Sequence, residues 1–148
     1  MPAYTEQFAF ATEVTAALAS VAAALDEADT LNKKILERRA AGGSPMSSDL
    51  ETVRRKAMDI AEVISATTWW VPPKHTTSLQ FLNFALEKLQ NAVDGADGPP
   101  TPDARESFDK LRPPAEATVG AWNAFKQNEL KAMNGRLKGG GEAELVVP

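Results

Sequence analysis

A regular apolar stripe lies near the middle of the chain, in residues Leu79, Leu82, Leu86, Leu89 and Val93. The spacings alternate between three and four, so in an α-helix these side chains share one face. Such a face is buried only when other helices pack against it. The stripe therefore predicts a helix over residues 77–94 that is central to an all-α core.

Apolar residues at the same spacing predict a long helix on the N-terminal side. It covers residues 5–41, is rich in alanine and should end where glycines and a proline follow. A second helix is predicted over residues 48–68. We expect it to open with a capping box, in which Ser48 and Glu51 bond each other's backbone N–H groups.

The last helical region begins after a strong start signal. Thr101 is a good N-cap and a proline follows it at the first helical position. Pro113-Pro114 lies inside the same apolar pattern, and proline removes a backbone donor and clashes with the preceding turn. We therefore expect the last helix to be broken or kinked there, into residues 102–112 and 114–137.

These helices predict one architecture for the whole chain. A length of 148 residues suits a single domain with a sizeable core. Residues 69–76 are expected to form an extended Trp/Pro crossover, and residues 139–148 a tail. We predict one all-α domain over residues 1–148, folded as an antiparallel up-down four-helix bundle with a long first helix.

Composition excludes several classes of function. The chain has no cysteine, which excludes disulfides, thiolate metal sites and a cysteine nucleophile. A net charge of −4 disfavours nucleic-acid binding. The apolar segment from Phe8 to Leu25 is interrupted by Glu13 and lacks a basic leader, so we interpret it as an amphipathic helix and predict no transmembrane segment.

No residue pattern indicates catalysis or a cofactor. His75 is the only histidine, which excludes a di-iron site with two Glu-x-x-His units and a bis-histidine haem. The carboxylates are scattered without a pair suited to acid–base chemistry. The glycines at 139–141 follow a helix, whereas phosphate-binding glycines precede one. We predict no cofactor, no metal and no enzyme activity.

Two sets of residues are candidates for binding. The first consists of tryptophans and neighbouring prolines that would contact a protein partner, a second copy or a ligand: Trp69, Trp70, Pro72, Pro73 and Trp122. Their alternative role is packing on the bundle. The second set is a basic cluster that would bind an anionic partner: Lys33, Lys34, Arg38, Arg39, Arg54, Arg55 and Lys56. The alternative for the basic cluster is a solvated face balanced by nearby carboxylates.

The second half of the chain carries an ordered set of turn and cap signals. They are Val71-Pro72-Pro73, Asp94-Gly95, Pro99-Pro100-Thr101-Pro102, Asn128-Glu129-Leu130 and Met133-Asn134. Residues 71–147 resemble the C-terminal helical region that follows the β-propeller in bacterial sortilin-like (VPS10-type, BNR-repeat) proteins. The resemblance implies an exported bacterial protein and a non-catalytic accessory bundle, and it carries over no active-site residue.

The first helix is longer than its neighbours, so part of its apolar stripe should remain uncovered. This favours self-association or docking to a partner domain. We therefore expect a non-catalytic interaction module whose partner is a protein or a second copy. The alternative is an extracytoplasmic bundle that senses a small ligand or signal, with a pocket near Trp69, Trp70 and Trp122.

Overall fold

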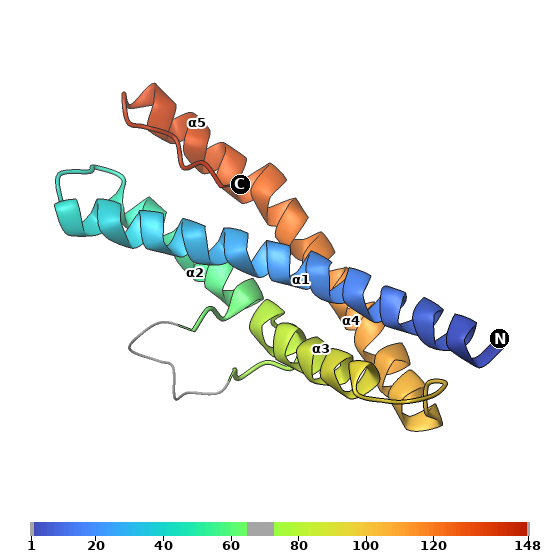
Figure 1. Ribbon diagram of the computed structural model, residues 1–148. Coiled ribbons are helices and arrows are strands. Elements are labelled where there is room, and N and C mark those ends of the chain that lie inside the picture. The colour runs from blue at the N-terminus through green and yellow to red at the C-terminus, as the bar shows by residue number, and fades with distance from the viewer. Residues whose placement is uncertain (1, 65–72, 148) are drawn as a thin grey trace.

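The structure is a computed structural model that describes residues 2–64 and 73–147, and in this part of the chain all regular elements are helical. The elements are α1 (Pro2–Ala41), α2 (Ser47–Ala61), α3 (Leu79–Asp94), α4 (Pro102–Phe125), the π-helix η1 (Lys126–Leu130) and α5 (Lys131–Gly139). The last three follow one another without a gap and form one rod (Figure 1). The predicted all-α four-helix arrangement with a long first helix is confirmed.

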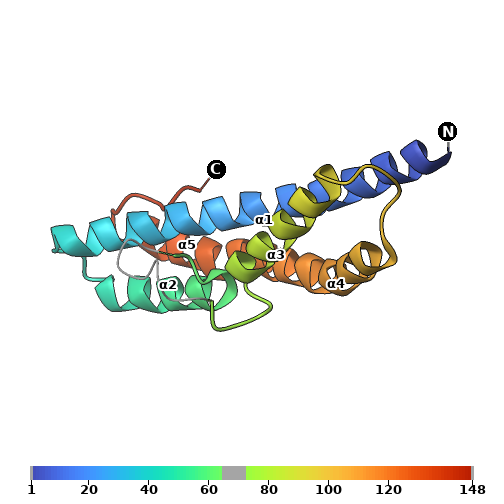
Figure 2. The ribbon, with the colours of Figure 1, turned by 60° about the horizontal axis from the view of Figure 1, so that its bottom comes forward.

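Helix α1 runs the length of the molecule, and each of the shorter helices α2 and α3 lies along one half of it (Figures 1 and 2). α2 lies along the C-terminal half of α1, where Arg54 bonds Asn32 at 3.4 Å. α3 lies along the N-terminal half, where Gln90 donates to Thr15 at 2.9 Å.

The directions of the helices correct the predicted up-down alternation. Residue 7 contacts residue 96 and residue 15 contacts residue 90, so α3 runs antiparallel to α1, as α2 also does. The rod of α4, η1 and α5 runs parallel to α1 (Figure 2). Helices α2 and α3 thus run in the same direction, one after the other along α1.

The predicted core stripe of α3 is confirmed, because all five of its apolar residues are buried. They pack with buried residues of the other helices, among them Phe10, Val14, Leu50 and Phe108. The Phe10 and Phe108 rings meet edge to face with centroids 5.7 Å apart, a favourable aromatic geometry. Thr101 caps α4 as predicted, accepting from the Ala104 N–H at 3.1 Å.

Two predictions about α2 are wrong. Its cap position is Met46, with no side-chain cap bond, and Glu51 bonds arginines instead of closing a capping box with Ser48. The helix also ends at Ala61, well before residue 68, because Glu62 takes a left-handed backbone with φ of 49°. That conformation is uncommon for a residue with a side chain, and the bonds made by the Glu62 carboxylate hold it.

The predicted break of the last helix is also wrong, because α4 continues through Pro113 and Pro114. Proline removes the bonds to the carbonyls four residues back, which here belong to Asp109 and Lys110. Both of those residues are exposed, where solvent can satisfy a freed carbonyl more easily than the core can. The departure from α-helical geometry comes instead at η1, which no sequence signal predicted.

The predicted tail is packed against the helices. Residues 142–147, which we call the C-terminal strap, return alongside α5 and α1 (Figures 1 and 2). Leu145 is only 2% exposed and belongs to the main core. The strap is therefore part of the folded unit.

Candidate functional site

The structure describes only part of the predicted set of tryptophans and prolines. Trp69, Trp70 and Pro72 lie outside the described residues. Pro73 is half-buried at the point where the described chain resumes before α3. The predicted contact role of Trp69 and Trp70 therefore stays a prediction.

Trp122 is a core residue, so its predicted place at an interface is wrong. The side chain is fully buried and stacks on Phe125 with ring centroids 5.1 Å apart and an angle of 20° between the planes. Its indole N–H donates to Glu27 of α1 at 3.0 Å. Lys126 pairs with the same Glu27 carboxylate, so an acid on α1 joins two residues of the rod.

Three arginines of the basic cluster converge on one carboxylate. Glu51 accepts from Arg39, from both ends of the Arg54 fork and from Arg55. Bidentate arginine–carboxylate pairs are among the stronger ionic hydrogen bonds. The bond from Arg54, together with the charges of Arg54 and Arg39, outweighs the effect of burial and lowers the pKa of Glu51 to about 2.

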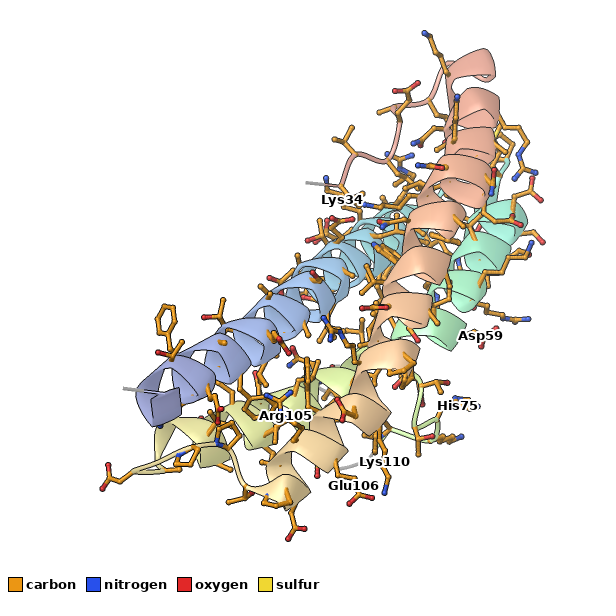
Figure 3. All side chains as sticks on the ribbon, turned by 90° about the vertical axis from the view of Figure 1, so that its right-hand side faces the viewer. Lys34, Asp59, His75, Arg105, Glu106 and Lys110 are labelled. Atoms are coloured by element: carbon orange, nitrogen blue, oxygen red, sulfur yellow. The ribbon has the colours of Figure 1, made fainter. Side chains whose placement is uncertain are left out.

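The other four cations of the cluster also have partners within the chain. Lys33 pairs with Asp29 at 2.8 Å and Lys56 with Glu129 at 3.0 Å. Lys34 and Arg38 donate to backbone carbonyls of the C-terminal strap, and Figure 3 shows Lys34 beside it. The cluster thus holds elements of the fold together, which favours the alternative of a balanced surface over an anion-binding patch.

The Glu51 carboxylate and the arginines that bind it give the stability of the protein a specific pH dependence. A carboxyl with a pKa near 2 when folded and near 4.5 when unfolded stabilises the fold fully above pH 4.5, and this contribution disappears as the pH falls toward 2. We expect wild type to exceed Glu51→Gln by about 2 kcal/mol in unfolding free energy at pH 7. Urea titrations should show the difference shrinking toward zero near pH 2.5. A difference independent of pH would contradict the account.

His75 contacts one carboxylate, that of Glu62. Its Nδ1 lies 3.1 Å from the Glu62 carboxylate, and the backbone N–H groups of Lys74 and His75 each donate to Glu62 at 2.8 Å. Burial would raise the pKa of Glu62, but these hydrogen bonds outweigh it and lower the pKa. His75 is exposed, and its contact with Glu62 fastens the chain just before α3.

The N-terminal half of α1 is apolar, and much of it lies outside the buried core. Within residues 5–41, an 18-residue window has a mean hydropathy of 1.7, enough in length and composition to cross a membrane. Core helices and leader segments pass the same test. What distinguishes this helix is that only 22% of the window is buried, and Phe8 is 74% exposed.

A groove of about 560 Å³ runs between this exposed face and α4. Its walls are mostly small side chains, chiefly Ala16, Ala17, Ser20, Val119 and Gly120. Arg112 closes one end, 3.4 Å from Glu116 and 4.0 Å from Glu13. Small residues let another helix or an aromatic ring approach the backbone closely.

A second hollow of about 650 Å³ lies beside η1 and has polar walls. Asn123, Gln127 and Lys131 line one side, and Glu144 of the C-terminal strap lines another. Single turns of π-helix occur often at functional sites. The polar side chains that line this hollow make it a candidate place for a small polar ligand.

The C-terminal strap is bound mainly through its backbone. Asn134 of α5 donates to the Leu145 carbonyl at 2.9 Å and accepts from the Leu145 N–H at 2.7 Å. The side-chain amide of Asn134 thus makes the two hydrogen bonds that the backbone of a neighbouring β-strand would make. The sequence offers one signal for this contact, an aliphatic Leu145-Val146-Val147 run directly after a glycine-rich stretch.

Comparisons of the chain with protein-family models, with curated proteins and with solved structures find no match. The resemblance to the sortilin-like helical region is therefore still a prediction. In residues 2–64 and 73–147, no group of three histidine, aspartate or glutamate side chains is placed to hold a metal ion.

Proposed function

We propose that the chain is a non-catalytic helical interaction module that self-associates through the exposed face of α1. One observation carries the proposal: the most apolar window of the longest helix leaves most of its residues outside the buried core. Large exposed apolar surfaces on folded proteins generally mark contact sites. A propeller or other partner domain of an exported bacterial protein is the alternative occupant of this face.

The shape of the face supports a second copy as the occupant. Twelve residues separate Phe8 from Ser20, which places Ser20 about 120° round the helix and about 18 Å along it. The protruding ring and the groove therefore lie on opposite flanks of the exposed face. In an antiparallel pair related by a twofold axis perpendicular to α1, each flank meets the same flank of the other copy, because a C2 interface uses the same patch of each copy. A second copy would therefore cover the exposed face with its own, and the two Phe8 rings would lie on the same side of the interface.

The size of the face indicates a weak complex. An 18-residue window is about 27 Å of helix, so two copies would bury about 1,000 Å², at the low end for specific interfaces. Assembly should therefore require high concentration. The charges at the groove end do not oppose it, because Arg112 lies next to both Glu13 and Glu116.

Sedimentation equilibrium from about 10 µM to about 1 mM tests the proposal. We expect a reversible dimer that Phe8→Ala weakens roughly thirtyfold, since a central aromatic anchor is worth about 2 kcal/mol. Phe84→Ala is the matched control, because Phe84 is also exposed but lies on α3. Equal effects of the two substitutions, or a monomer at every concentration, would contradict self-association through α1.

The polar hollow beside η1 supports a second candidate, an extracytoplasmic sensor of a small ligand. The hollow differs from the site expected from sequence, because Trp122 is buried in the core and does not line it. Small polar compounds that raise the melting temperature of wild type but not of Gln127→Ala would favour this function. Their failure to do so would remove it.

A further inference from the structure

The contacts of the C-terminal strap are those by which proteins bind an extended peptide. Lys34 donates to the Val146 carbonyl, Arg38 donates to the Ala143 carbonyl at 2.7 Å, and Asn134 pairs with both backbone groups of Leu145. The one strap side chain fully buried in the core is that of Leu145, and Val147 is partly buried against it. Backbone bonds with a pocket for one apolar side chain form a general peptide-binding mode. We call this site, formed by α1 and α5, the strap cleft.

The strap joins α5 through three glycines that reverse the chain. Gly141 has a φ of 76°, which favours glycine, and the next N–H, that of Glu142, donates to the Leu137 carbonyl at 2.8 Å. A methyl group on Gly139 would meet no neighbouring atom within 4 Å. The reversal thus depends on the backbone conformation of Gly141 and not on that of Gly139.

We propose that the strap cleft is a peptide-binding site that acts between molecules, and that its ligand is the C-terminal strap of a second copy of this chain. The strap makes the same contacts in its own cleft as in the cleft of a second copy. The conformation of the hinge and the protein concentration therefore decide which cleft it occupies. The second copy is the occupant because its strap supplies the same leucine and backbone groups that fill the cleft here. This inference does not depend on the exposed face of α1.

Substitution of the hinge glycines gives the first test. Gly141→Ala disfavours the reversed hinge, because a left-handed backbone is costly for any residue with a Cβ atom, and it should shift each hinge toward the open, exchanged form roughly fivefold or more. Gly139→Ala is the matched control and should leave the ratio of monomer to dimer unchanged. Both variants carry Phe8→Ala, so that association through α1 does not contribute.

Cross-linking reports directly which cleft the strap occupies. Lys131 and Glu144 line the same hollow, are exposed, and sit on α5 and on the strap respectively. Since the chain has no cysteine, Lys131→Cys copies can be incubated with Glu144→Cys copies and treated with a short bismaleimide. We expect a covalent dimer whose yield rises with concentration and rises further with Gly141→Ala. Copies carrying Thr101→Cys replace the Glu144→Cys copies as the control for random collision.

Three outcomes would contradict the proposal. A dimer yield no higher than with Thr101→Cys would show that the strap stays in its own cleft. A chain carrying both Lys131→Cys and Glu144→Cys that gives only internal cross-links with Gly141→Ala would show the same. The absence of any cross-link in that chain would show that the strap does not occupy the cleft. Dimers seen in the Phe8→Ala background would support strap exchange whatever becomes of the α1 interface.

Discussion

Trp122→Ala should lower the free energy of unfolding by about 4 kcal/mol, the range for truncating a fully buried aromatic. The substitution empties the space beside Phe125 and removes the indole N–H that bonds Glu27 at 3.0 Å. A small domain has a total stability of about 5–15 kcal/mol, so the variant should be close to unfolding. Urea titration followed by circular dichroism at 222 nm measures the loss.

Trp122→Phe separates the two parts of this effect. It keeps a ring against Phe125, loses the hydrogen bond and leaves a smaller cavity than alanine does, while Lys126 still pairs with Glu27. We expect a cost of about 1–2 kcal/mol. If Trp122→Ala costs less than about 1 kcal/mol, Trp122 is not a core residue, and the interface role predicted from sequence would regain support.

Leu145→Ala should cost about 3 kcal/mol, as expected for a buried leucine whose removal leaves a cavity. The neighbouring Val146→Ala should change stability by less than about 0.5 kcal/mol, since surface substitutions rarely do more. Leu145 is 2% exposed and Val146 is 63% exposed, although the two are adjacent and similar in sequence terms. Unfolding titrations of both variants decide whether the strap is structural. Equal small effects would mean that residues 142–147 behave as the tail predicted from sequence.

Periodicity was sufficient to predict the helices but not their directions. The stripe of α3 and the cap at Thr101 depend on residues close in sequence, and both are confirmed. The direction of α3 depends on contacts between residues distant in sequence, such as Gln90 with Thr15, and on the left-handed Glu62, which ends α2 and bonds Lys74 and His75 ahead of α3. Glutamate carries no sequence signal for that conformation.

The prolines and the basic cluster show a second limit of sequence analysis. Pro113 and Pro114 lie where the residues four positions back, Asp109 and Lys110, are exposed, a property of the face and not of the dipeptide. The basic cluster resembled a binding patch in part because several of its partners are distant in sequence. Lys34 and Val146 are an example, separated by 112 positions.

The binding surfaces were predicted only in outline. The excess length of the first helix predicted an overhanging apolar stripe, but only Phe8 of that stripe is exposed, because Val14 and Val21 are buried and Leu18 packs against the core. The groove beside this face needs α4 for its second wall, and the strap cleft needs Asn134 to face Leu145. Both depend on the packing of separate helices, which no single segment encodes.

The proposal that α1 contacts α1 is tested most directly by cross-linking within the face. Thr12 and Ala16 are exposed residues lining the groove, and an antiparallel pair centred between Phe8 and Ser20 brings Thr12 of one copy close to Ala16 of the other. Copies carrying Thr12→Cys, mixed at high concentration with copies carrying Ala16→Cys, should form a mixed disulfide that Phe8→Ala suppresses. If that disulfide forms no faster than one between Thr12→Cys and Ala132→Cys copies, α1 is not the contact surface.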